Sequence, residues 1–302
     1  MTAANRTDMG PARLALGPIL FHWEAAAKRD FYFRIADEAP IDIVYLGETA
    51  CSKRAPFFEP HLPEIAERLA RAGKEVVYST LALVMSARET AALCTLAMEP
   101  GLVVELNDLA GADLVAGRRH VIGPFVNVYN EETLRYLARR GAERVVLPAE
   151  LPKKALAALA SDSSGAALEV QAFGRLPLAL SSRCYHARAH GLHKDGCQYV
   201  CSLDADGLSV TTLDGDGFLA INGTMTMSFT VINLLAELAA LRCLGVSVFR
   251  LWPQSADMVA ISRLFRDTLD GHLDSATAEI HLAEKVRFAP LTRTFYQGPE
   301  LG

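Results

Sequence analysis

The sequence predicts an α/β fold, a (β/α)8 TIM-like barrel with an insertion after the seventh strand that carries cysteines. About 51% of the 302 residues are hydrophobic, which is enough to bury a large core. From Arg13 onward, eight short β-rich apolar runs alternate with amphipathic segments, as in βα units around a parallel sheet. A doubly wound open sheet is the alternative, but it normally uses five or six strands. The number of runs therefore favours the barrel.

The eight runs give the expected strands in chain order. They are Leu14–Leu20, Ile41–Leu46, Glu75–Ser79, Leu102–Leu106, His120–Val126, Arg144–Leu147, Leu168–Phe173 and Val246–Leu251. Between them, Pro60–Ala72 and Glu131–Arg139 show apolar residues at helical spacing. Gly73 and Gly141 follow basic last turns of these helices, where a left-handed C-cap is favoured. These features predict helices that alternate with the strands.

The chain is expected to form a single barrel domain over residues 1–302. The βα repetition breaks at a cysteine-containing insertion over residues 181–230, in which Asp204–Gly207 and Asp214–Gly217 separate hairpin-like runs. The aspartates there are interpreted as turn residues, because neither pair continues into a calcium-binding loop with a terminal glutamate. Residues 286–302 are expected to be an irregular C-terminal tail.

Composition excludes several classes of function. Charged residues make up 22% of the chain and the net charge is −5, so no positive field attracts phosphate backbones and no nucleic-acid partner is expected. The N-terminus lacks an apolar core of signal-peptide length, and no run is long enough to form a transmembrane segment. The sequence therefore predicts a cytoplasmic protein. Its six cysteines should stay reduced, which favours ligation or catalysis over disulfides.

Four cysteines are predicted to form one metal centre. Cys184, Cys197 and Cys201 have the spacing C-x12-C-x3-C on loop-like sequence, where thiolates can turn toward a common centre. Cys51 follows the second expected strand, as Cys184 follows the seventh. In a barrel both strand ends emerge at the C-terminal rim, where active sites lie. Cys51 is therefore the expected fourth ligand.

The spacing favours a 4Fe-4S cluster over a zinc ion but leaves both open, and it also leaves open a site without metal. Four thiolates make a closed structural zinc site as well. Such sites normally use paired C-x2-4-C knuckles, however, and here only Cys197 and Cys201 are close in sequence. A long gap and a remote fourth ligand are more typical of cluster ligation.

Other possible ligands are weaker. His186, His190 and His193 lie on the same loop and could replace a thiolate, but loop histidines are more often solvated. Cys94 and Cys243 fall within amphipathic helices, where a free cysteine usually serves as a small buried hydrophobic residue. We therefore expect neither of these two cysteines to bind the metal.

Polar residues at the ends of expected strands are candidates for the mouth of the barrel. They are Glu48, Glu105, Asn107, Asn127 and Glu150. The ordinary alternative for each is to cap the following helix. The sequence has no G-x-S-x-G elbow, Walker loop or H-E-x-x-H motif. The commonest signatures of hydrolases, nucleotide-binding proteins and zinc proteases are thus missing.

Two arginines are expected near the cysteines. Arg175 lies just beyond the seventh expected strand, and Arg183 precedes Cys184. Their fixed positive charges could offset thiolate charge or hold an anionic substrate. With Glu48, they are the weak candidates for catalytic residues, since no catalytic acid or base stands out.

The motifs together resemble a known family. Tyr45-Leu-Gly-Glu-x-x-Cys51, Phe173-Gly-Arg-Leu-Pro-Leu-Ala179, Ser182-Arg-Cys184 and Cys197-x3-Cys201 resemble the ubiquinone-biosynthesis members of the collagenase-like peptidase family. The likeness extends over roughly 14–290. The resemblance implies a 4Fe-4S cluster on Cys51, Cys184, Cys197 and Cys201. It further implies O2-independent, anaerobic hydroxylation of the ubiquinone precursor ring.

The resemblance also implies partners. They are a UbiU-like paralogue forming a heterodimer with this chain, a UbiT-like lipid carrier, and an isoprenoid-aromatic ubiquinone intermediate, with prephenate as the expected hydroxyl donor. Peptidase-like members of the family carry His-Gly-Ala before their cysteine, whereas this chain has Ser181-Ser182-Arg183. A peptidase-like hydrolase and a non-catalytic, cluster-bearing assembly subunit are the two alternatives.

Overall fold

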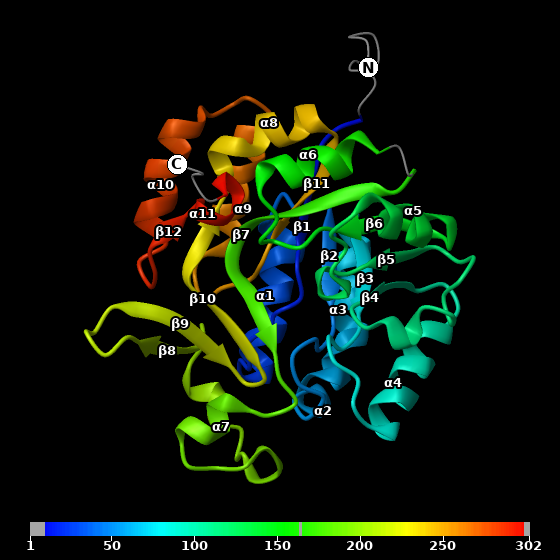
Figure 1. The fold of residues 1–302 in the computed structure, drawn as a ribbon, viewed down its shortest axis with the longest axis vertical. Helices are drawn as coiled ribbons and strands as arrows, with labels where there is room; N and C mark the ends of the chain where they lie inside the picture. Colours follow the sequence, from blue (N-terminus) through cyan, green and yellow to red (C-terminus); the bar gives the residue numbers. More distant parts are fainter. Residues whose placement is uncertain (1–9, 163–164, 299–302) are drawn as a thin grey trace.

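A computed structural model describes residues 10–162 and 165–298. Eight parallel strands close into a barrel, because the last of them, β11, pairs with both β7 and β1. The strands are β1 (Arg13–Leu16), β2 (Ile43–Leu46), β3 (Glu75–Ser79), β4 (Val103–Leu106), β5 (His120–Ile122), β6 (Ala142–Val146), β7 (Ala167–Leu180) and β11 (Val246–Leu251). Figure 1 shows helices packed outside this barrel. The predicted (β/α)8 barrel is confirmed.

The helices alternate with the strands. They are α1 (Ala25–Glu38), α2 (Ala55–Phe58), α3 (Leu62–Arg71), α4 (Ala87–Met98), α5 (Glu131–Arg139), α6 (Lys153–Ser161), α7 (Tyr185–Ala189), α8 (Leu238–Leu244), α9 (Met258–Leu269), α10 (Ser275–Lys285) and α11 (Thr294–Gln297). Gly73 and Gly141 follow α3 and α5 with φ angles of +78° and +103°, as the C-cap pattern predicted. In the part of the chain that the structure describes, no helix is long and apolar enough to cross a bilayer.

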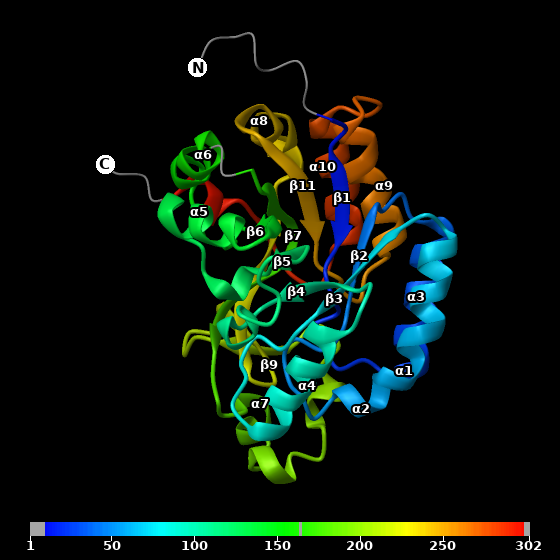
Figure 2. The same ribbon diagram turned by 90° about the vertical axis from the view of Figure 1, so that its right-hand side faces the viewer.

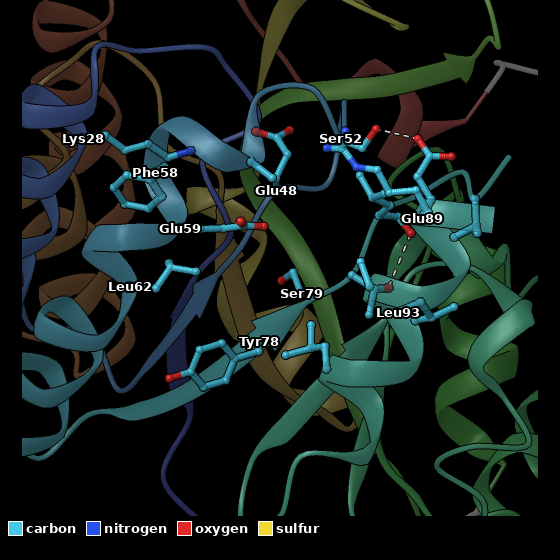
Figure 3. Close-up of a pocket in the computed structure, with 17 residues that line it drawn as sticks. Lys28, Glu48, Ser52, Phe58, Glu59, Leu62, Tyr78, Ser79, Glu89 and Leu93 are labelled. Atoms are coloured by element: carbon cyan, nitrogen blue, oxygen red, sulfur yellow. Dashed lines mark hydrogen bonds between the residues drawn. The ribbon is translucent and has the colours of Figure 1, made fainter. Parts of the chain in front are cut away.

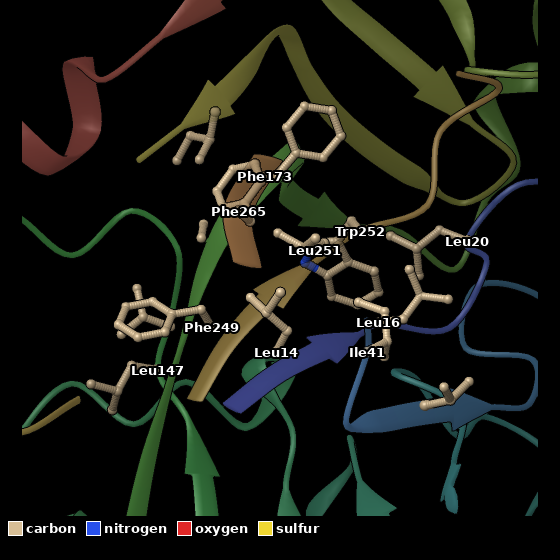
Figure 4. Packing of buried hydrophobic residues seen from close by; sticks show 14 of the residues in the cluster. Leu14, Leu16, Leu20, Ile41, Leu147, Phe173, Phe249, Leu251, Trp252 and Phe265 are labelled. Atoms are coloured by element: carbon tan, nitrogen blue, oxygen red, sulfur yellow. The ribbon is translucent and has the colours of Figure 1, made fainter. Parts of the chain in front are cut away.

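Side chains alternate between two cores along the strands. Ala15 packs inside the barrel, whereas Leu14 and Leu16 belong to the larger core between barrel and helices. Figure 4 shows this outer layer, to which Phe249 contributes from within β11 and Trp252 from just beyond its end. The strands are thus buried on both faces, which is why they read as continuous apolar runs in the sequence.

Charged residues fill part of the barrel interior. The fully buried Arg250 guanidinium pairs with Glu105 at 2.7 Å and with Glu169 at 2.5 Å. The Tyr45 hydroxyl donates to Glu169 at 2.6 Å, and the Asn107 amide donates to Glu105 at 3.1 Å. Glu105 and Asn107 were expected at the open mouth, but this network buries both of them. Both side chains are therefore part of the packed barrel.

Strand β7 leaves the barrel at its midpoint. Up to Phe173 it pairs with the parallel strand β11, and from Phe173 to Leu180 it pairs with the antiparallel β10 (Met225–Asn233). The change occurs at Gly174, whose φ is +112° and whose missing Cβ would lie 2.6 Å from Trp252 Cβ. Only glycine fits such a bend. The strands β8 (Leu208–Thr211) and β9 (Gly217–Asn222) extend this antiparallel arm beyond the barrel (Figure 1).

The chain returns to the arm near its C-terminus. The two-residue strand β12 (Leu291–Thr292) pairs with β10, and α11 follows it. Both elements fall within residues 286–302, which were expected to be an irregular tail. Residues 299–302 lie outside the described part of the chain.

Candidate metal centre

All four predicted cysteines line one small pocket. Cys51 lies between β2 and α2, Cys184 precedes α7, and Cys197 and Cys201 follow on the same connection between α7 and β8. Both α2 and α7 lie at the same end of the barrel (Figures 1 and 2). The fold thus brings together thiols that are up to 150 residues apart in the sequence (201 − 51 = 150).

The turn after β2 fixes Cys51. Gly47 has a φ of +132°, and a Cβ there would lie 2.5 Å from the carbonyl oxygen of Ser79 on β3, so the close approach requires glycine. The Glu48 carboxylate then accepts hydrogen bonds from the backbone amides of Ala50 at 2.9 Å and Cys51 at 3.0 Å. Glu48, a weak catalytic candidate from sequence, therefore orders the loop that presents Cys51.

The other three thiols lie on a loop with unusual backbone geometry. The Cys184 sulfur accepts a hydrogen bond from the Ala187 amide at 3.4 Å at the start of α7. Gln198 and Tyr199 have φ angles of +49° and +54°, which residues other than glycine rarely adopt. They are two of the three residues between Cys197 and Cys201, and such local strain is typical of functional sites.

The turn between β9 and β10 connects the two cysteine loops. Thr224 donates its hydroxyl proton to the carbonyl oxygen of Ala50 at 2.8 Å, next to Cys51. The Thr224 carbonyl in turn accepts the Ser181 amide at 3.0 Å, ahead of Cys184. One residue therefore holds the Cys51 loop and the Cys184 loop in fixed register.

Arg54 is a buried cation against the thiols. Its guanidinium donates to the Leu20 carbonyl at 2.9 Å and to the Asn222 side-chain oxygen at 3.0 Å, and it lies close enough to the Cys201 thiol to lower the pKa of that thiol. A Cβ on Gly223 would lie 2.5 Å from the guanidinium, so the glycine leaves the space that Arg54 occupies. Sequence reasoning did not identify Arg54.

Burial and charge act in opposite directions on the thiols. Burial raises the pKa of Cys51 and of Cys201, while the Arg54 guanidinium lowers both. The neighbouring Cys184 and Cys197 raise the pKa of Cys201 further, because nearby thiolates repel each other's negative charge. A metal that binds as thiolate complex must therefore displace protons here, so its binding depends on pH.

The thiols are spread more widely than one tetrahedral ion requires. Among residues 10–162 and 165–298, no three cysteine sulfurs lie within 4.8 Å of one another. Zinc–sulfur bonds of about 2.3 Å in a tetrahedron place sulfurs about 3.8 Å apart. The cysteine sulfurs would therefore have to move closer together to bind a single zinc ion.

The histidines of the same loop form a separate group. His186, which also lines the cysteine pocket, pairs with the Asp204 carboxylate at 2.9 Å, and the His190 ring stacks parallel to it. Ligand atoms of these three residues lie within 4.8 Å of one another. His193 does not line the pocket. Because the His186 Nε2 atom is already paired with Asp204, the cysteine sulfurs remain the main candidate ligands for a metal in the pocket.

The two predicted arginines point elsewhere. The Arg175 guanidinium is buried and donates to the carbonyls of Ser228, at 2.8 Å, and Phe229 on β10. Arg183 is exposed, and neither arginine lines the cysteine pocket. The cation beside the thiols is Arg54 instead. Arg175 was expected near the cysteines because it follows the seventh expected strand. Instead, its guanidinium is bound to backbone carbonyls of β10, with which this part of β7 pairs.

The remaining candidates fall outside this pocket. Asn127 and Glu150 line another cavity next to β7, where Glu150 accepts the Tyr129 hydroxyl. Cys94 is half-buried in α4, and Cys243 is exposed on α8, so the expectation of burial is wrong for Cys243. Neither of these cysteines lines the pocket.

Comparison with known proteins defines the class. The profile of Peptidase family U32 matches residues 31–300, and the chain therefore belongs to this family. This agrees with the collagenase-like family that the cysteine motifs resemble.

Similar solved structures add no functional information. A chain of the tryptophan synthase complex from Pyrococcus furiosus shares 12% identity with a TM-score of 0.43, covering 90% of this chain and 96% of that one. The spore cortex-lytic enzyme SleL from Bacillus megaterium QM B1551 shares 11% identity with a TM-score of 0.43, covering 85% and 74%. An HpcH/HpaI aldolase from Desulfitobacterium hafniense DCB-2 shares 10% identity with a TM-score of 0.32, covering 96% and 100%.

Proposed function

We propose that this U32-family chain holds a 4Fe-4S cluster on Cys51, Cys184, Cys197 and Cys201. The observation that carries the proposal is the common pocket, which these four thiols line from two separate loops. Four thiolates are the usual ligand set of such a cluster. The wide spacing of the sulfurs supports a cluster over zinc, the main alternative.

When bound, the cluster would supply one-electron transfer or hold the loops together. The chain's own residues have defined tasks around it. Glu48 and Thr224 fix the Cys51 loop, and Arg54 places a positive charge beside Cys201. Hydrogen bonds and charge near the sulfurs set the potential of such clusters. Because all four ligands are cysteines, substrate activation at iron is less favoured than electron transfer or structural support.

We further propose that the chain acts as the UbiV-type subunit of an O2-independent hydroxylase of ubiquinone biosynthesis. Its partner would be a UbiU-like paralogue, a UbiT-like carrier would deliver the isoprenoid-aromatic intermediate, and prephenate would provide the hydroxyl group. The support is family membership together with the cysteine motifs quoted above. The barrel and the pocket are consistent with this role.

Anaerobic co-expression of the chain with a UbiU-like paralogue tests the role. In cells without O2-dependent ring hydroxylases, the pair should restore the hydroxylated isoprenoid-aromatic intermediate, detected by mass spectrometry, and each subunit alone should not. Restoration by a Cys184→Ala variant would contradict a role for the cluster. Peptide hydrolysis in air by iron-free protein would instead favour the peptidase-like alternative. Complex formation that is lost in Cys184→Ala, without any hydroxylation by the native pair, would favour the assembly subunit.

A further inference from the structure

A larger cavity lies beside the Cys51 loop and is separate from the cysteine pocket. It has a volume of about 370 Å³, within the range of about 300–1,000 Å³ typical of small-molecule sites. It opens between α3 and α4, over β3 (Figure 3). Its apolar wall includes Phe58, Leu62, Tyr78, Leu81, Leu93 and Leu96. Such a lining suits a ligand with a mainly hydrocarbon body.

Lys28 is the one strongly buried cation in the lining of this cavity. Its side chain is 4% exposed, and its ammonium lies 4.5 Å from the centre of the Phe58 ring. Within the part of the chain that the structure describes, its ammonium makes no hydrogen bond or ion pair, although its backbone amide donates to the Glu24 carbonyl oxygen at 2.9 Å. Figure 3 shows the side chain running past Phe58, with its amino end toward the cavity. A buried ammonium is unfavourable unless an acceptor pairs with it.

The nearby carboxylates have other partners. Glu48 accepts the backbone amides of Ala50 and Cys51. Glu89 accepts the Ser52 hydroxyl at 2.5 Å, drawn as a dashed line in Figure 3, and the Met85 amide at 2.9 Å. Burial lowers the pKa of Lys28 and the Glu48 charge opposes this shift, but within the described residues neither carboxylate accepts a hydrogen bond from the ammonium. An oxygen on a bound ligand is the acceptor that the cavity lacks.

Charge around the cavity limits the ligand. Three carboxylates line it, those of Glu48, Glu59 and Glu89, against two cations, Lys28 and Arg88. Glu59 and Arg88 are exposed, so only Lys28 reaches deep into the apolar part. A dianion would be repelled by this arrangement. A neutral or singly charged molecule with one accepting oxygen fits it.

We propose that this cavity binds the ring of a prenylated phenol, whose oxygen accepts a hydrogen bond from Lys28 and whose hydrocarbon part packs against Phe58, Leu62 and Leu93. The choice of a phenol rests on the proposed function, in which an isoprenoid-aromatic ring is the substrate. The segment 48–52 lines this cavity through Glu48 and Ser52 and lines the cysteine pocket through Cys51. It therefore connects ring binding to the cysteines.

Binding measured without turnover tests the proposal. Ligand-observed NMR on anaerobically purified protein gives the affinities of 2-prenylphenol and of prenylbenzene, which lacks the oxygen. A hydrogen bond from a buried charged donor should make the phenol bind about tenfold more tightly or better. Lys28→Met should remove this preference, and the exposed control Lys153→Met should keep it. A second variant, Ala92→Trp, fills the cavity from α4 and should weaken both ligands.

The outcomes separate this inference from the proposed function. Equal affinity for the two ligands in the native protein, or a phenol preference that survives Lys28→Met, overturns the inference, as does unchanged binding in Ala92→Trp. Iron analysis of the same sample reports on the cluster independently. Full iron loading without phenol binding would refute the cavity assignment alone, and phenol binding by iron-free protein would refute the cluster alone.

Discussion

Arg54 contributes most at the residue scale, because its guanidinium joins the barrel, the antiparallel arm and a cysteine. It is buried, donates to Leu20 and Asn222, and lowers the pKa of the Cys201 thiol by its charge. We expect Arg54→Met to lower the free energy of unfolding by about 2–4 kcal/mol, because the buried Asn222 side-chain oxygen loses its donor and the Leu20 carbonyl keeps only the Asn222 amide. Urea denaturation against the exposed control Arg183→Met measures this loss.

The same variant affects the proposed cluster. Removing a positive charge beside a cluster disfavours its reduced, more negative state. The midpoint potential of Arg54→Met should therefore be more negative than that of the native protein in an anaerobic EPR titration. A potential that stays the same or rises would show that Arg54 does not act on a cluster.

Spacing along the chain predicted the cysteines, but contacts across the fold determine their surroundings. Cys184, Cys197 and Cys201 are close in sequence, and the strand pattern placed Cys51 at the same rim. Arg54 follows Cys51 by three residues, but only the folded chain shows that Gly223 leaves space for it. For Glu105 the local pattern was misleading. Its position at a strand end suggested exposure, but the carboxylate is buried against Arg250, which lies far along the chain.

Strand β7 is the decisive element, because one strand serves both the barrel and the arm. Its bend at Gly174 combines a φ of +112° with backbone and side chain of Trp252 within 3.4 Å of the Cβ position. We expect Gly174→Ala to cost about 3 kcal/mol or more in unfolding free energy, from backbone strain and overlap together. Thermal denaturation of the native protein and of Gly174→Ala measures this loss of stability.

A matched control exists for this glycine. Gly73 has a φ of +78° but open space at its Cβ position. Gly73→Ala should cost only the backbone strain, about 1–2 kcal/mol. Equal losses for Gly174→Ala and Gly73→Ala would contradict the close packing against Trp252.

The strands of the barrel were predicted where the apolar runs were strong. The prediction was incomplete for β7, which belongs both to the barrel and to the antiparallel arm. The barrel half of β7 was predicted as Leu168–Phe173, but the strand continues to Leu180. The extension carries Arg175 and Pro177, which obscure a strand pattern, and its partner β10 lies about 50 residues later. Pairing of this kind depends on the distant strand, so local sequence does not reveal it.

At the scale of the whole molecule, folded-state stability should depend on pH through His120. This histidine is buried at the start of β5, and its Nδ1 lies 2.8 Å from the Arg118 carbonyl oxygen. Burial lowers the pKa of His120 from 6.5. Above pH 6.5 both folded and unfolded forms are neutral; below it the unfolded chain takes up a proton first, so stability falls as pH falls toward the lowered pKa.

Comparison of two proteins isolates this effect. The loss of unfolding free energy between about pH 7.5 and about pH 5.5 should be larger for the native protein than for His120→Gln, which does not titrate in this range. Urea denaturation at both pH values measures the two losses. Identical losses would show that His120 carries its proton equally well in the folded chain.

Iron and sulfide analysis of anaerobically purified protein tests whether the four cysteines of the pocket hold a 4Fe-4S cluster. We expect about four iron and four sulfide per chain. Each of Cys51→Ala, Cys184→Ala, Cys197→Ala and Cys201→Ala should lose most of this iron, while Cys94→Ala and Cys243→Ala should retain it. A colourless native protein that contains one zinc ion per chain, or no metal, would contradict this expectation.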